Sequence, residues 1–139
     1  MTARLPEQRL YDWFRRRVGH LVHSTRIENR MNRDTPDLFV AYPQWQGWIE
    51  MKALSKFPAR QDTLVRLPKW TTGQRYWAKR HIASGGRVAL LIEVDGTLTI
   101  WRADDSPDAL TTEQWGTHCI WIGTRNAGAG EILAALAKV

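Results

Sequence analysis

Residues 36–53 read PDLFVAYPQWQGWIEMKA, two largely apolar runs separated by a short segment with proline and glycine. Its apolar residues predict a strand over 38–42 and a returning strand over 48–53, separated by a turn over 43–47 that contains proline and glycine. Two strands joined by so short a turn form an antiparallel hairpin. In such a hairpin the start of the first strand lies beside the end of the second.

This hairpin brings two carboxylates and a lysine together. Asp37 precedes the first strand, and the second contains Glu50 and Lys52, which share one face with Trp48 because side chains alternate along a strand. Asp37 is therefore expected within roughly 5–8 Å of Glu50 and Lys52 as a direct or diagonal neighbour. Carboxylates suit a hard cation such as Mg²⁺, and a lysine beside it suits a charged phosphodiester transition state. A Glu-x-Lys triplet is also common as an ion pair on a solvated strand.

Two helices offer further polar groups on apolar stripes. The first is predicted from Pro6 to Val18 or Leu21, and Glu7 falls on the stripe that contains Leu10. A carboxylate there needs a partner, unless it lies in the exposed first turn, where the helix dipole favours it. The second helix is predicted from Thr71 or Thr72 to about Ser84, and Gln74 begins its stripe. That glutamine can reach a phosphate or water, or serve as a half-buried capping residue.

The remaining pattern predicts an α/β fold with a central mixed sheet flanked by helices. Val88–Ile92 is a continuous apolar run typical of a doubly buried strand, and Asp95-Gly96 is a hairpin signal. Further elements are expected as strands over 25–30, 97–101 and 119–122, and as a C-terminal helix over 130–138. We expect one domain over 1–139, with a core of about 5–101 and a C-terminal extension, 103–139, of unassigned function.

These motifs resemble a known family. Glu7 on a leading helix, Ile27-Glu28-Asn29, Pro36-Asp37-Leu38, Trp48-Ile49-Glu50-Met51-Lys52 and Thr71-Thr72-Gly73-Gln74 occur in the order used by PD-(D/E)xK nucleases. The chain resembles in particular the small phage and bacterial proteins of the virus-type replication-repair nuclease (VRR-NUC) group. It is similar in plan to Holliday-junction resolvases. The resemblance covers roughly residues 5–101 and implies a restriction-endonuclease-like α/β core.

The resemblance also implies roles for single residues. Asp37 and Glu50 would be ligands of Mg²⁺, for which Mn²⁺ is expected to substitute, with the backbone carbonyl of Met51 as a third ligand. Lys52 would position the attacking water, and Gln74 matches the downstream glutamine of the pattern. Glu7 and Glu28 compete for the role of the supporting acid.

Two departures affect the loops more than the chemistry. Thr35 stands where related sequences often have glycine, and the stretch over 54–70 is longer than in the compact pattern.

Composition narrows the classes of function. The 139 residues include 43% hydrophobic residues and eight Trp, enough for a real core, and the net charge of +6 with a pI near 10.0 suits a polyanionic partner. A single cysteine, Cys119, excludes an internal disulfide and a Cys-rich zinc site. The N-terminus lacks the apolar region of a signal peptide, and no apolar run approaches a membrane span, so we expect a cytoplasmic protein.

Nucleic-acid contacts are expected from basic residues near the carboxylates. Arg30, Arg33, Lys69 and Arg75 are the candidates for binding phosphates, which positions a duplex without reading its sequence. No recognition-helix pattern is present. Most of the tryptophans suit the core, but Trp45 and Trp70 are candidates for stacking on an unpaired base or for an oligomer contact.

The predicted function is a Mg²⁺-dependent, structure-directed DNA endonuclease of replication, recombination or repair, in a bacterial or phage-infected cell. A branched duplex such as a Holliday junction is the expected substrate. Symmetric cutting of a four-way junction takes two active sites, so this prediction includes a homodimer. The alternatives are a less selective nicking or flap nuclease, a non-catalytic basic DNA-binding module and, more weakly, a protein that binds a partner through a Trp-rich surface.

Overall fold

The computed structural model describes residues 5–27, 31–105, 107 and 109–139. Its elements are, in chain order, α1 (Pro6–Val18), β1 (His23–Arg26), β2 (Leu38–Tyr42), β3 (Trp45–Leu54), α2 (Thr72–Ala83), β4 (Val88–Val94), β5 (Thr97–Arg102), the 3₁₀ turn η1 (Ala103–Asp105), α3 (Thr112–His118), β6 (Trp121–Thr124) and α4 (Ala129–Leu136).

The strands form one mixed sheet in the order β1-β2-β3-β4-β5-β6. Four of the neighbouring pairs are antiparallel, and β3 and β4 are parallel. A parallel pair cannot be joined by a tight turn, and here α2 lies in the connection between β3 and β4. This crossover returns the chain to the sheet with the beginning of α2 beside the end of β3.

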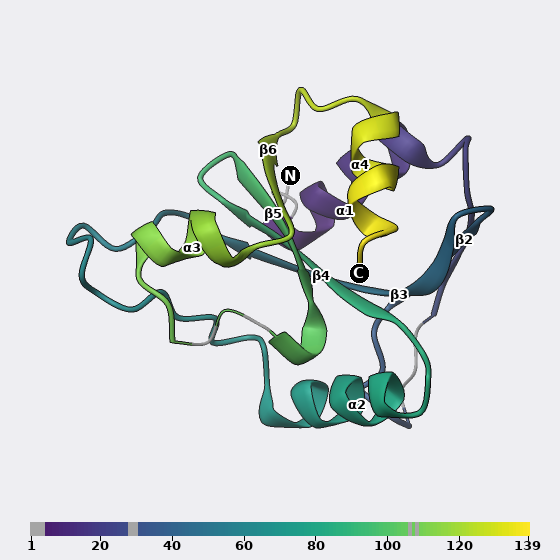
Figure 1. Cartoon of the computed structure of the whole chain (residues 1–139), viewed down its shortest axis with the longest axis horizontal. Coiled ribbons are helices and arrows are strands. Elements are labelled where there is room, and N and C mark those ends of the chain that lie inside the picture. The colour runs from purple at the N-terminus through teal and green to yellow at the C-terminus, as the bar shows by residue number, and fades with distance from the viewer. Residues whose placement is uncertain (1–4, 28–30, 106, 108) are drawn as a thin grey trace.

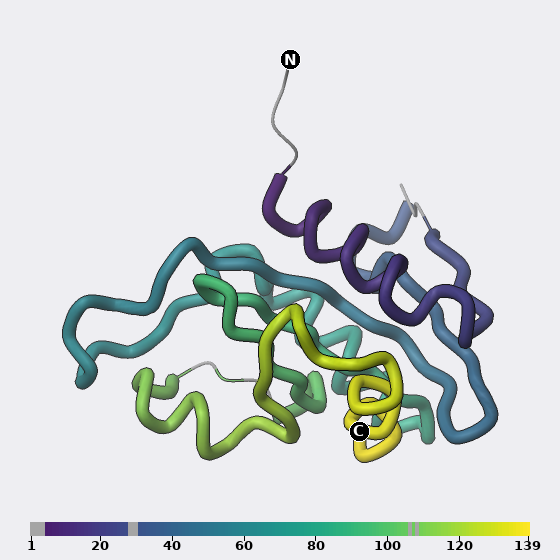
Figure 2. Tube along the Cα trace, turned by 90° about the horizontal axis from the view of Figure 1, so that it is seen from above, coloured from purple at the N-terminus to yellow at the C-terminus, as the bar shows by residue number. Residues whose placement is uncertain are grey.

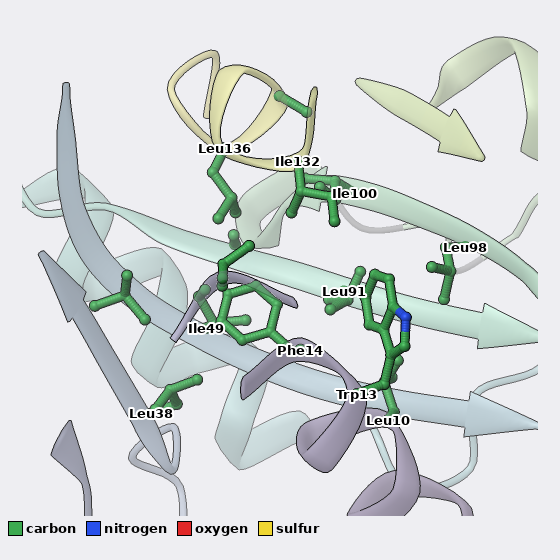
Figure 3. Close-up of a cluster of buried hydrophobic side chains, with 14 of the residues drawn as sticks. Leu10, Trp13, Phe14, Leu38, Ile49, Leu91, Leu98, Ile100, Ile132 and Leu136 are labelled. Atoms are coloured by element: carbon green, nitrogen blue, oxygen red, sulfur yellow. The ribbon is translucent and has the colours of Figure 1, made fainter. Parts of the chain in front are cut away.

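Helices cover both faces of the sheet, with α1 and α4 on one side and α2 on the other (Figure 1). The tube view shows α1 as a separate layer lying over the sheet (Figure 2). In the close-up, Trp13 and Phe14 of α1 lie against Leu91 and Ile49 of the sheet, with Ile132 of α4 alongside (Figure 3). The opposite face packs Leu90, Ile92 and their neighbours against α2 and α3. Because side chains alternate between the two faces along β3 and β4, these strands contribute residues to two separate apolar layers.

Local sequence signals account for several element boundaries. Thr71 is the N-cap of α2 and forms a reciprocal capping box with Gln74. Asp95 and Gly96 both have positive φ, 48° and 82°, as a two-residue hairpin turn with matching twist requires. All seven residues of β4 are buried, which confirms the prediction of a doubly buried strand.

The structure corrects both tryptophan predictions. Trp45 is the first residue of β3 rather than part of the turn, and only 3% of its surface is exposed. Trp70 is equally buried and packs in the layer beneath α2. Neither side chain is available to stack on an unpaired base. For Trp45 the physical reason is that β3 begins three residues earlier than predicted, so that this residue belongs to the strand and its side chain faces the core.

Other boundaries also shift. β1 begins at His23 rather than Thr25, and residues 28–30 of that predicted strand lie outside the described residues. β6 begins at Trp121, two residues later than expected, and α4 begins at Ala129. Helix α3 was not predicted, although its capping box of Thr111 and Gln114 is present in the sequence.

The C-terminal residues complete the fold. β6 pairs with β5, and α4 buries apolar side chains in the same layer as α1. No helix within the described ranges is both long and apolar enough to cross a bilayer.

Candidate active site

The strand register places the two carboxylates of the hairpin opposite each other. Leu38, the first residue of β2, pairs with Ile49, so Asp37 lies opposite Glu50 at the next position along the hairpin. Opposed residues of an antiparallel pair present their side chains on the same face. The electrostatic influence of Asp37 on Glu50 agrees with this proximity. Asp37 is exposed, whereas Glu50 is 6% exposed.

One cavity of about 310 Å³ collects the predicted site residues. Asp37, Glu50, Met51 and Lys52 line it from the hairpin, Glu7 lines it from α1, and Gln74 from α2. A larger hollow beside the β2–β3 turn has no acidic residue in its lining, and so lacks the donors that a hard cation needs. The chemistry expected from the sequence therefore belongs to the smaller cavity.

Glu50 is the buried carboxylate of this cavity, and its pKa is shifted. Burial raises the pKa of Glu50 to about 7, and the charges of Asp37 and Glu7 add to the rise, while Lys52 opposes it. The Nζ atom of Lys52 lies 3.1 Å from Oε1 of Glu50, and both side chains are almost fully buried. One buried cation thus compensates only part of the cost of ionising this carboxyl group.

Two residues from the α2 region fix the orientation of Glu50 and Lys52. The Lys52 ammonium donates to the backbone carbonyl of Lys69 at 2.7 Å, which holds it beside the carboxylate. The Nε2 atom of Gln74 lies 3.5 Å from Oε1 of Glu50, at the long limit of a hydrogen bond. The other end of that amide accepts from the backbone N–H of Thr71 at 3.0 Å. Gln74 therefore acts as a capping residue and reaches the site at the same time.

Glu7 combines the two alternatives that the sequence left open. It lies in the first turn of α1, where the helix dipole favours an acid, and its side chain is half-buried. It also has a partner, because the Nζ atom of Lys69 is 3.7 Å from its Oε2. The carboxylate faces the cavity from the helix layer, while Glu50 faces it from the sheet.

The backbone of Met51 faces the open side of β3. The N–H of Trp48 donates to the carbonyl of Arg87, on the side of β4. Because backbone groups alternate sides along a strand, the carbonyl of Met51 points toward β2 instead. The ladder between β2 and β3 ends at the Leu38–Ile49 pair, so β2 has no residue opposite Met51. This carbonyl is therefore directed at the edge where Asp37 lies.

The donor set fits a hard divalent cation. Asp37 and Glu50 supply carboxylate oxygens, and the repulsion between them is what a cation between them would relieve. Within the part of the chain that the structure describes, no three His, Cys, Asp or Glu residues cluster tightly enough to enclose a metal. Mg²⁺ usually keeps several waters and needs only one or two protein carboxylates, so it suits this set better than an enclosed zinc site.

The predicted DNA contacts divide into three groups. Arg33 is exposed on the lining of the cavity, and Lys69 is exposed beside Glu7. Arg75 is drawn inward, because its Nε donates to the carbonyl of Trp70 at 3.2 Å, and burial lowers the pKa of its guanidinium. Arg30 and the competing acid Glu28 lie outside the described residues.

Sequence reasoning missed a cluster at the rim of the cavity. The guanidinium of Arg26 lies 4.2 Å above the ring of Tyr11, and its Nη2 donates to the side chain of Gln8 at 3.0 Å. All three residues line the cavity. The sequence contained one signal for this cluster: helical spacing places Gln8 and Tyr11 on the same side of α1 as Glu7.

The fold has a counterpart of solved structure. A scan against protein-family models found no match, and a search of curated proteins found no similar sequence. Among solved structures, the chain is similar to Hjc of Archaeoglobus fulgidus, a Holliday junction resolvase from an archaeal hyperthermophile, with a TM-score of 0.50 and 10% sequence identity. The match covers 88% of this chain and 98% of Hjc. It confirms the predicted restriction-endonuclease-like α/β fold.

Proposed function

We propose that this protein is a Mg²⁺-dependent, structure-directed DNA endonuclease that resolves branched DNA and belongs to the PD-(D/E)xK nucleases. The observation that carries the proposal is the convergence of Asp37, Glu50, Lys52 and Gln74 in one cavity, with Lys52 and Gln74 both directed at the same oxygen of Glu50. A hairpin and a separate helix supply this group. Surface ion pairs do not require such convergence, whereas hydrolysis of a phosphodiester does.

The residues divide the chemistry among them. Asp37, Glu50 and the carbonyl of Met51 would hold the cation, which when bound supplies charge neutralisation at the phosphate and activation of a water. Lys52, fixed by the carbonyl of Lys69, places an ammonium where negative charge develops during attack. Gln74 and Lys52 together hold the carboxylate of Glu50 in one orientation. Glu7 adds a supporting acid from the helix side of the cavity.

A branched duplex is the proposed substrate for two reasons. The similar structure is that of a Holliday junction resolvase, and the net charge of +6 supplies phosphate contacts that are independent of sequence. Resolution of a four-way junction needs two active sites, so the proposal includes a homodimer in which each copy cuts one strand.

The test compares cleavage of four labelled substrates in the presence of Mg²⁺. A four-way junction, a flap, a linear duplex and a supercoiled plasmid are incubated with the wild type and with the Glu50→Gln and Lys52→Gln variants. Glu113→Gln, at an exposed carboxylate of α3, is the matched control. Paired symmetric cuts in the junction, lost in both site variants and kept in the control, are expected.

Three other results would each contradict a part of the proposal. Equal cutting of all substrates would refute branched-DNA selectivity and favour a general nicking nuclease. DNA binding without cutting by the wild type would refute the enzymatic proposal and leave a binding module. Light scattering during size-exclusion chromatography tests the dimer, and a strict monomer in the presence of the junction would contradict symmetric resolution.

A further inference from the structure

The net positive charge of this chain originates from one segment. Residues 63–92 contain no Asp or Glu and six basic residues, namely Arg66, Lys69, Arg75, Lys79, Arg80 and Arg87. The remainder of the chain holds 14 of the 20 Lys+Arg and all 14 Asp+Glu, so it is neutral. The net charge of +6 therefore originates entirely from the loop before α2, from α2 itself and from the turn that follows it.

The outer face of α2 presents this charge to solvent. Its inner side buries Ala78 against the sheet, while Tyr76, Lys79 and Arg80 are exposed on the other side. Tyr76 is 62% exposed, and the Arg80 guanidinium lies 5.6 Å from the centroid of its ring. We call these three residues the α2 face. An exposed aromatic ring that supports a guanidinium holds the cation outward for a planar anion such as phosphate.

The α2 face lies on the same helix that supplies Gln74 to the candidate active site. Gln74, in the first turn of the same helix, reaches Glu50, and the carbonyl of Lys69 just before the helix holds Lys52. At 1.5 Å per residue, Arg80 lies about 9 Å along the helix from Gln74. Gln74 faces inward and Arg80 faces solvent, so this axial distance is the least separation between them. Since a strand of duplex DNA advances about 3.4 Å per nucleotide, the α2 face lies at least about two or three nucleotides from the phosphate being cut.

Two other arrangements fit less well. A second copy of the chain docking through the same face would place like charges against each other, which opposes a symmetric contact. The arginines of α1 form another basic surface. There, however, Arg17 donates a hydrogen bond to the carbonyl of Arg125, and the carboxylate of Asp12 lies among the exposed arginines and offsets part of their charge. They also lie on the opposite side of the sheet from α2.

We infer that the α2 face binds the phosphate backbone of the duplex arm that leads into the active site, at least about two or three nucleotides from the scissile bond. This inference rests on the proposed function for the position of the cut. It adds a binding surface that determines affinity rather than chemistry. Lys79 and Arg80 each contact a phosphate, and Tyr76 keeps Arg80 extended toward it.

Binding without cleavage tests this surface. Fluorescence anisotropy in EDTA measures the affinity of the full chain for a labelled duplex and a four-way junction over a range of salt concentrations. The Lys79→Gln/Arg80→Gln double variant removes two phosphate contacts. We expect the slope of log K against log salt to decrease in magnitude by about 2, with affinity on the order of tenfold to hundredfold lower near 0.1 M salt.

Two controls separate this site from the loss of net charge. Arg15→Gln/Arg16→Gln removes the same charge from exposed positions of α1 and is expected to leave the slope close to that of the wild type. Lys79→Arg/Arg80→Lys keeps both charges and is expected to retain the slope. Circular dichroism checks that each variant folds.

The outcomes distinguish this inference from the proposed function. A wild-type slope in the Lys79→Gln/Arg80→Gln variant, or an equal loss in the α1 variant, would overturn the inference even if the protein cuts DNA. The expected change in slope would support the α2 face even if the protein cuts nothing.

Discussion

Replacing Glu50 by glutamine is expected to make the protein more stable at neutral and alkaline pH while it abolishes cleavage. Glutamine has nearly the shape of a protonated glutamate, and it keeps an amide that can still meet Lys52 and Gln74. It removes the negative charge that burial disfavours in this cavity. Stability and activity should therefore respond to this one substitution in opposite directions.

The magnitude follows from the pKa of the buried carboxyl group. Burial raises the pKa of Glu50 from 4.5 to about 7, and each pH unit of difference is worth 1.36 kcal/mol, so the effect is about 3 kcal/mol. Between these values the folded state binds the extra proton, so stability falls as pH rises. The contribution is fully present below pH 4.5 and is lost as pH rises to about 7. In a chain of this size, about 3 kcal/mol corresponds to about 10 °C in Tm.

The assay is urea unfolding of both proteins in EDTA at several pH values. We expect similar stabilities near pH 5 and a gap of about 3 kcal/mol in favour of Glu50→Gln near pH 8. Mg²⁺ is expected to narrow this gap at pH 8, because it should stabilise only the protein that retains both carboxylates. A gap that stays below about 1 kcal/mol across the range would refute the reasoning, since Lys52 would then compensate fully for the buried charge.

Three further substitutions test the fold. Arg125→Met should lower the free energy of unfolding by about 2 kcal/mol in urea titrations, because it leaves the buried Glu93 carboxylate without the guanidinium that binds it at 2.6 and 2.7 Å. The partial exposure of Arg125 limits this cost, and an unchanged urea midpoint would contradict the prediction. Gly96→Ala should lower the free energy of unfolding by about 1 kcal/mol in thermal unfolding, because alanine is strained at the φ of 82° found there, although its Cβ would contact no other atom. A stabilised variant would count against this turn geometry. Leu136→Ala should cost about 3 kcal/mol in the same urea assay through the cavity left under α4, and a loss below 1 kcal/mol would show that α4 does not pack on the sheet.

Much of the candidate site could be predicted from the sequence because its geometry is local. Glu50 and Lys52 share a face through strand alternation, and a tight hairpin fixes the place of Asp37 beside them. Gln74 was predicted from its place at the start of the apolar stripe of α2, although a long irregular stretch separates β3 from that helix. The relations among Asp37, Glu50 and Lys52 depend only on the hairpin and on alternation within one strand.

The parts that could not be predicted depend on packing between distant segments. The carbonyl of Lys69 is a partner of Lys52 only because the irregular stretch before α2 folds back onto β3. Trp45 and Trp70 looked exposed by their place in the sequence, but each fills an apolar layer whose other members come from elsewhere in the chain. Helix α3 was missed because seven residues give too short a pattern for helical periodicity to be recognised.

The sequence by itself determined which side chains are candidates for the chemistry, the strands that present them and the segment that carries the net charge, because composition, alternation and capping act over short distances. Only the tertiary structure decided their electrostatic state. The pKa of Glu50 rises to about 7 because α1, β2 and α2 close around it, and burial of that kind is a property of the assembled layers rather than of any segment.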